Sequence, residues 1–100
     1  MPALTGLKVL DLTQWEAGTS CTQALAWMGA DVVKIELPGT GDPGRTLSRD
    51  FWDDSEYFGN WNCNKRSVEL NLRDSRGRDL LLKMVPRFDV FIENFGPGVV

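Results

Sequence analysis

The first 36 residues carry a strand–helix–strand pattern, and this pattern constrains the fold more than any other feature of the chain. The apolar run Leu7–Leu12 predicts a buried strand, and Asp31–Glu36 predicts a second one. Between them, Gly18–Met28 has apolar residues at helical spacing and is followed by Gly29, a residue type that ends helices. A strand, a helix and a strand within about thirty residues form a βαβ unit, whose two strands are parallel.

The rest of the chain continues this alternation. Ser67–Leu72 alternates strictly between polar and apolar residues, which predicts a half-exposed strand. Asp74 is a suitable N-cap for a helix that continues through Val85, with Pro86 at or near its end. Asp89–Glu93 predicts a further strand. Strands that alternate with helices in this way predict an open α/β sheet.

Two connecting stretches differ in composition from the predicted strands and helices. Leu37–Arg49 is rich in glycine and proline, which predicts a long, turn-rich loop that is too polar to bury. Asp50–Asn64 is rich in aromatic residues and predicts a short helix around Ser55–Asn60. We interpret these aromatic side chains as packing rather than as a stacking platform for bases, because no basic residues are interleaved with them. After the last predicted strand, Pro97 is expected to open a further helix.

Composition excludes several classes of protein. The chain has 100 residues and a formal net charge of -3, which fits at most one small domain and disfavours a nucleic-acid binder. Its 42% hydrophobic and 25% charged residues match a soluble globular protein, which argues against disorder and against a membrane span. Because it has no histidine, a Ser-His-Asp triad and a His-ligated metal site are excluded from this stretch.

The two cysteines, Cys21 and Cys63, are too few and too far apart for a metal knuckle or a disulfide scaffold. We interpret them as reduced thiols of a cytoplasmic protein. The N-terminus has no basic stretch followed by an apolar run, so we expect no signal peptide and a cytoplasmic location. Cys21 shares the apolar side of its predicted helix with Leu25 and Met28, which predicts packing rather than nucleophilic chemistry.

Three turns are candidates for a ligand site. In an open parallel sheet, ligands bind outside the carboxyl ends of the strands, which here means Thr13–Thr19, Leu37–Arg45 and Asn94–Gly98. The first turn leads into a helix N-terminus, where main-chain N–H groups favour an anion. The turn has neither the glycine pattern of a dinucleotide site nor that of a P-loop, which disfavours both kinds of site and leaves a phosphate or an acyl carboxylate open as the ligand.

Individual charged residues leave alternatives open. Glu16 either binds substrate or caps the following helix. Lys65 and Arg66 either offset phosphate charge or form a solvated basic turn. Arg45 and Arg49 present the same choice, with the solvated surface favoured.

Several of these segments together resemble the class III CoA-transferases, whose members include formyl-CoA:oxalate CoA-transferase and whose relatives include acyl-CoA racemases. The match runs in one order and nearly end to end: Leu7–Thr13, Ala17–Gly18, Met28–Glu36, Gly41–Asp42, Arg45, Asn62–Leu72 and Asp89–Gly98. The likeness of Asn62–Arg66 to the formyl-CoA transferases favours transfer over racemisation. The alternatives are a racemase of the same superfamily and a non-catalytic α/β nucleotide-binding module.

The resemblance implies a fold, an assembly and a chemistry. Residues 1–100 correspond to the N-terminal portion of a large, Rossmann-like CoA-binding domain, the remainder of which is not present, in an enzyme that forms an interlocked homodimer. Such enzymes move CoA between an acyl-CoA and a small free carboxylic acid through an aspartyl intermediate, with no tightly bound cofactor and no metal. The nucleophilic aspartate corresponds to a position beyond Val100, so no catalytic residue is assigned here.

The resemblance also implies CoA contacts. Glu16 and Ala17 match a turn that lines the thioester and acyl group, and Arg73 is the expected phosphate partner. The remaining matches lie along the CoA nucleotide and beside the pantetheine arm, respectively: Leu70, Asn71 and Leu72, then Asn94, Phe95 and Gly96. Leu37 stands where some relatives carry a basic nucleotide contact, and Thr19 stands where a proline is usual.

Overall fold

The computed structural model describes residues 2–46 and 56–100. Arg49, the predicted start of the aromatic stretch and its residues Phe51 and Trp52 lie outside the described residues. Within the part of the chain that is described, no helix is long and apolar enough to cross a membrane.

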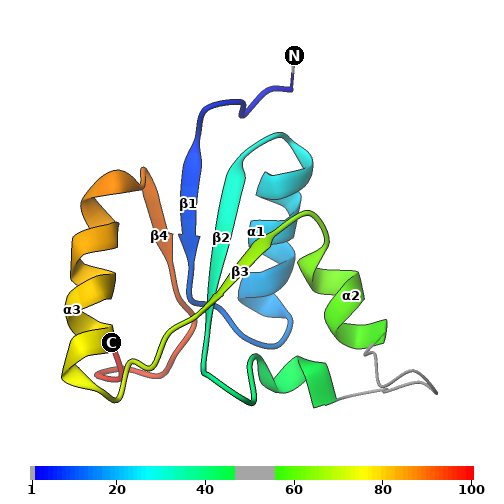
Figure 1. Cartoon of the computed structure of the whole chain (residues 1–100). Coiled ribbons are helices and arrows are strands. Elements are labelled where there is room, and N and C mark those ends of the chain that lie inside the picture. The colour runs from blue at the N-terminus through cyan, green and yellow to red at the C-terminus, as the bar shows by residue number, and fades with distance from the viewer. Residues whose placement is uncertain (1, 47–55) are drawn as a thin grey trace.

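The described chain is built on a sheet of four parallel strands, as the βαβ pattern predicts (Figure 1). In chain order the strands are β1 (Lys8–Asp11), β2 (Asp31–Glu36), β3 (Arg66–Glu69) and β4 (Val90–Ile92). Their spatial order is β3-β2-β1-β4, so the chain moves outward from β1 and then returns to form β4 on its other side. In a doubly wound sheet this reversal beside β1 marks the point where ligands bind.

Helices cover both faces of the sheet (Figure 1). On one face lie α1 (Ala17–Trp27) and α2 (Glu56–Asn62), while α3 (Ser75–Met84) covers the other. The predicted cap of α3 is confirmed, because the Asp74 carboxylate accepts a hydrogen bond of 2.9 Å from the main-chain N of Arg76. Short 3₁₀ helices at Pro43–Thr46 and Val85–Arg87 complete the described chain, the second around the predicted terminator Pro86.

Strand alternation divides the apolar core into two clusters. Val9 and Val32 pack with Ala26 against α1, whereas Leu10 and Val33 lie on the α3 side. Because helices cover both faces, both sets are buried, which explains why the adjacent residues Val9 and Leu10 of the first strand are both apolar.

Two glycines let helices begin close against the strand ends. A Cβ at Gly18 would lie 2.3 Å from Cγ2 of Thr13, and a Cβ at Gly77 would lie 1.9 Å from the main-chain O of Asn71. Both distances are far below van der Waals contact. The N-terminal turns of α1 and α3 are therefore fixed against the loops that carry the candidate site.

Several local predictions are wrong, each for a physical reason. The strand predicted over Ser67–Leu72 ends at Glu69, and its four residues are exposed because β3 is an edge strand. The predicted loop after β2 is not wholly solvated, since Asp42 is 1% exposed. Residues 97–98 form a turn, and the helix expected to open at Pro97 stays a prediction.

Cys21 is exposed, contrary to the packing predicted for it. The inward face of α1 is formed by Thr19, Thr22, Gln23 and Ala26, which places Cys21 on the outside. The apolar residues Trp27 and Met28 are exposed as well. The apolar periodicity therefore predicted the helix correctly but predicted the wrong buried face.

Candidate functional site

The three predicted turns meet at the carboxyl edge of the sheet. Asn94 accepts a hydrogen bond from the main-chain N of Gln14 and donates one to its O, both at 2.9 Å. Oδ1 of Asp42 accepts a hydrogen bond of 3.2 Å from the main-chain N of Trp15. The turn after β1 is therefore bonded to the turn after β4 on one side and to the turn after β2 on the other.

The turn after β1 has an unusual backbone. Trp15 has a φ of 66°, in the left-handed region that bulky residues rarely adopt. The hydroxyl of Thr19 donates to the main-chain O of Trp15 and, at 3.1 Å, to that of Glu16. Glu16 and Ala17 follow, both exposed, at the start of α1.

The capping alternative for Glu16 is not confirmed. Glu16 occupies the N-cap position of α1, but its side chain makes no capping hydrogen bond. Its exposed carboxylate stands beside the Trp15 turn at the carboxyl edge. Substrate binding by Glu16 stays a prediction.

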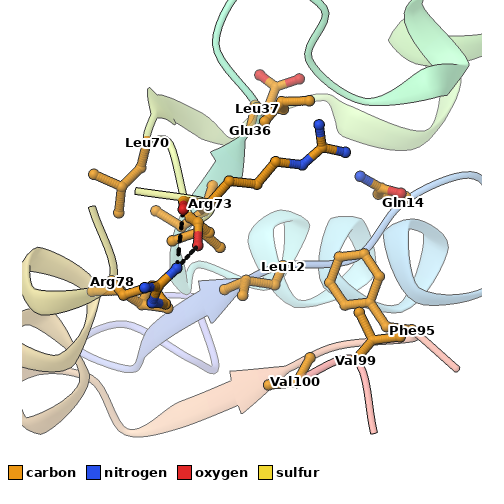
Figure 2. A pocket seen from close by; sticks show the side chains of 13 residues that line it. Leu12, Gln14, Glu36, Leu37, Leu70, Arg73, Arg78, Phe95, Val99 and Val100 are labelled. Carbon is orange, nitrogen blue, oxygen red and sulfur yellow. Dashed lines mark hydrogen bonds between the residues drawn. The ribbon is translucent and has the colours of Figure 1, made fainter. Parts of the chain in front are cut away.

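A pocket of about 390 Å³ opens at this edge, on the α3 side of the sheet (Figure 2). Leu12 and Ile35, at the strand ends, and Leu81 of α3 give it an apolar lining. Arg73 and Arg78 add two guanidinium groups. The pocket thus combines an apolar wall with cationic groups, as a site for a long ligand with an anionic end requires.

The structure brings together four of the nine predicted CoA contacts in this pocket: Leu70, Leu72, Arg73 and Phe95. Two others hold loops. Oδ1 of Asn71 accepts a hydrogen bond of 3.0 Å from the main-chain N of Arg73, and Asn94 binds Gln14 as described. Glu16, Ala17 and Gly96 lie in the turns at the same edge and are not among the residues that line the pocket.

Sequence reasoning missed Arg78. Its Nη1 donates hydrogen bonds of 3.1 Å to the main-chain O atoms of Leu72 and Arg73, drawn as dashed lines in Figure 2. Arg78 therefore fixes the loop that carries Arg73. The sequence held one indication of this role. An arginine in the first turns of a helix is unfavourable to the helix dipole, so a stabilising contact outside the helix is expected for it.

Lys65 is buried inside the fold, so it is neither part of a solvated basic turn nor an exposed partner for phosphate. Its ammonium is 2% exposed and lies 3.1 Å from Oδ2 of Asp11. It also donates to the main-chain O of Thr19 at 3.1 Å and to Oδ1 of Asn62 at 2.8 Å. Burial lowers the pKa of Lys65, while the Asp11 carboxylate opposes that shift.

Arg66 lies at the opposite, amino edge of the sheet. It forms an ion pair of 2.7 Å with Asp31, the first residue of β2. Arg66 therefore lies away from the candidate site, and its largely exposed guanidinium fits the solvated alternative.

Arg45 is engaged within the fold as well. Its guanidinium donates to both carboxylate oxygens of Glu36, at 2.7 and 2.8 Å, and stacks 3.7 Å from the ring centroid of Phe58. Burial alone would raise the pKa of Glu36. Hydrogen bonds from Arg45, Ser67 and the main-chain N of Asp42 outweigh burial and lower that pKa to about 2.

A comparison with models of protein families shows to which family the chain belongs. The model of CoA-transferase family III matches residues 4–100. The chain belongs to this family. Among curated proteins, the formyl-CoA:oxalate CoA-transferase of Streptomyces avermitilis is 54% identical over 99 residues, which cover 98% of this chain and 24% of that protein. The Escherichia coli protein of the same name is 50% identical over 98 residues, covering 97% of this chain and 24% of that protein.

Solved structures agree with the family. A CAIB/BAIF family protein from Brucella suis matches with a TM-score of 0.86 and 39% identity, over 94% of this chain and 26% of that one. A hypothetical protein from Mycobacterium tuberculosis matches with a TM-score of 0.88 and 35% identity, over 98% of this chain and 27% of that one. The chain spans about a quarter of the length of the curated relatives it matches, 24% of both the Streptomyces avermitilis and the Escherichia coli protein.

Proposed function

We propose that residues 1–100 form the CoA-binding start of the large domain of an acyl-CoA:carboxylate CoA-transferase. The pocket at the carboxyl edge carries this proposal, because one cavity joins apolar walls to the guanidinium groups of Arg73 and Arg78. CoA has matching chemistry, with a phosphate-bearing nucleotide at one end and a long, weakly polar arm that ends in the thiol. The formyl-CoA:oxalate CoA-transferases among the relatives support the same substrate class.

The residues fit this substrate in order along the edge. Arg73 extends across the pocket in Figure 2 and would pair with phosphate oxygens. Leu70 and Leu72 would pack against the nucleotide, with Asn71 holding the loop. Phe95 would lie along the pantetheine arm, between Asn94 and Gly96.

The acyl end would meet the turn that follows β1. Glu16 and Ala17 stand exposed at the start of α1, next to the residues that bond the three turns together. Main-chain N–H groups at a helix start favour the oxygen of a polarised carbonyl. We place the thioester beside Glu16 and Ala17 for this reason.

The proposed chemistry follows the covalent route of the family. An aspartate carboxylate attacks the thioester carbon and expels the CoA thiolate, leaving a mixed anhydride. The thiolate then attacks the aspartyl carbonyl and releases the donor carboxylate, which gives an aspartyl-CoA thioester. The acceptor carboxylate repeats the two steps in reverse, so that each bond broken is matched by one formed and no ATP is needed. In this proposal the aspartate lies beyond Val100 and the enzyme is a cytoplasmic, interlocked homodimer without a tightly bound cofactor.

The test uses the full-length protein with formyl-CoA and isotopically labelled oxalate, followed by a panel of other small acids. We expect labelled acyl-CoA to form without ATP, with mass spectrometry as the readout. Background exchange across the whole panel would overturn transfer. A parallel incubation in D₂O tests the racemase alternative, which predicts deuterium at the α-carbon of a branched acyl-CoA with no CoA exchange.

A further inference from the structure

The buried ion pair between Lys34 and Asp42 lies directly against the turn that follows β1. Both side chains are 1% exposed, and Nζ of Lys34 lies 2.9 Å from Oδ2 of Asp42. Nζ of Lys34 also donates a 2.7 Å hydrogen bond to the main-chain O of Thr13. Since Asp42 accepts from the main-chain N of Trp15, the pair binds main-chain groups on either side of Gln14.

The turn is thus held from both neighbouring strands. The side chain of Asn94, just after β4, binds both main-chain groups of Gln14. Lys34, in β2, and Asp42, in the loop after it, bind the main chain of Thr13 and Trp15. Three consecutive residues are therefore fixed by side chains from two other segments.

Overall stability is a poor explanation for this arrangement. Replacing a buried ion pair by apolar side chains of similar volume is often neutral or stabilising, so the fold does not need these charges. The left-handed backbone of Trp15 is also costly and persists only where its surroundings determine it. A buried charge pair and a strained residue meet at one short turn, immediately before Glu16 and Ala17.

We propose that Lys34 and Asp42 are positioning residues that hold the Thr13–Trp15 turn so that Glu16 and Ala17 meet the acyl thioester. This inference rests on the proposed function. Neither residue lines the pocket, so they act through the turn rather than through CoA. Loss of the pair should therefore lower kcat more than it raises the KM for acyl-CoA, which is held mainly on the other face of the sheet.

The decisive variant is Lys34→Met with Asp42→Leu in the full-length protein. It removes both charges together, so no buried charge is left without a partner, and it removes both bonds to the turn. We expect a folded protein with a lowered melting temperature, because the main-chain groups of Thr13, Trp15 and Gly44 lose their side-chain partners. We expect kcat lowered by about tenfold to a hundredfold and the KM for acyl-CoA changed by less than about threefold. If this variant does not fold, Lys34→Met with Asp42→Asn replaces it, because the amide oxygen keeps an acceptor for the main-chain N–H groups of Trp15 and Gly44 and no buried charge is left unpaired. We expect a smaller fall in kcat with the same KM.

The matched control is Arg66→Met with Asp31→Asn, which removes the ion pair at the amino edge and should leave kcat unchanged. Amide hydrogen exchange provides a readout independent of activity. We expect faster exchange over residues 13–17 in the decisive variant and no change over α3. Wild-type kcat, or unchanged exchange over 13–17, in a folded variant would overturn the inference alone. Absence of CoA transfer by the wild type would overturn the proposed function and the catalytic role of the pair with it.

Discussion

The two faces of the sheet differ sharply at its carboxyl edge. On the α1 face, Asp11, Lys34 and Glu36 are buried and ion-paired, and Glu36 also borders the pocket. On the α3 face, the residue after Asp11 and the residue before Glu36, Leu12 and Ile35, line an open pocket. Side chains of a strand alternate between faces, so neighbours in one strand serve opposite purposes. The α1 face supports the turns with fixed charge, and the α3 face offers a cavity to a ligand.

The two faces also differ in their cationic side chains. Some of them pair with carboxylates of the fold, whereas another is available to a ligand. Lys65 and Arg45 are paired with Asp11 and Glu36. Among the described residues, Arg73 has no carboxylate within ion-pair distance, and it lines the pocket. A cation already neutralised inside the fold gains little from a phosphate, whereas an unpaired one at a pocket gains a charge-assisted bond.

The largest effect is expected on the α1 face. Lys65→Met leaves the Asp11 carboxylate, which is fully buried, without its cation. An uncompensated buried charge costs about 3–5 kcal/mol, so we expect the free energy of unfolding to fall by that amount. Denaturant unfolding of the full-length protein measures it.

Arg66→Met is the control on the neighbouring residue, because its ion pair with Asp31 is exposed. Exposed pairs contribute about 0–1 kcal/mol, and the control should lose no more than that. Adding Asp11→Asn to Lys65→Met should restore part of the stability. Equal losses in the Lys65 and Arg66 variants would contradict the distinction between the buried layer and the surface.

An acid-dependent effect is expected next, again on the α1 face. The pKa of Glu36 is lowered from 4.5 to about 2 in the folded protein, so its ionised form stabilises the fold above pH 4.5. That contribution is lost as the pH falls from about 4.5 to about 2, and it amounts to about 3 kcal/mol. We expect Glu36→Gln to be less stable than the wild type at pH 6 and the difference to shrink at pH 3. A difference that stays constant over this range would argue against an ionised, hydrogen-bonded Glu36.

Much of the fold was accessible from the sequence because its signals are local. The apolar runs of β1 and β2, the Asp74 cap and the turn-rich segments after the strands each depend on a few adjacent residues. Parallel pairing then follows from the crossover rule and brings the three turns to one edge. The sequence therefore predicted where the candidate site lies, but not how its side chains are arranged.

The polar layer was not accessible in this way. Lys34 reaches Asp42 only because the loop after β2 folds back over the strand end. No pattern of adjacent residues in the sequence predicts that the loop folds back. The same layer explains the error at Cys21. The hydroxyl of Thr22 donates to Asp11 and the main-chain O of Thr19 accepts from Lys65, so polar residues of α1 face inward beside the buried charges, while Ala26 packs on the apolar cluster. Apolar periodicity therefore pointed to the wrong side of the helix.

The smallest effect of the three is expected on the α3 face, in ligand affinity rather than stability. Arg73→Ala removes a guanidinium from the pocket without breaking an ion pair among the described residues. We expect CoA binding to weaken by about 1–3 kcal/mol, the usual range for a hydrogen bond to a charged group, with little change in unfolding. Calorimetric titration of the full-length protein with CoA measures the affinity.

Arg76→Ala is the matched control, because Arg76 lies three residues away, is exposed and pairs with Asp74 outside the pocket lining. It should leave CoA affinity unchanged. Higher salt should also reduce the difference between wild type and Arg73→Ala, since screening weakens an exposed charge pair with phosphate. If both variants lost affinity equally, a general loss of positive charge near α3 would explain the result. Arg73 would then not be a specific phosphate partner in the pocket. The assignment of ligand binding to the α3 face of the sheet would be contradicted.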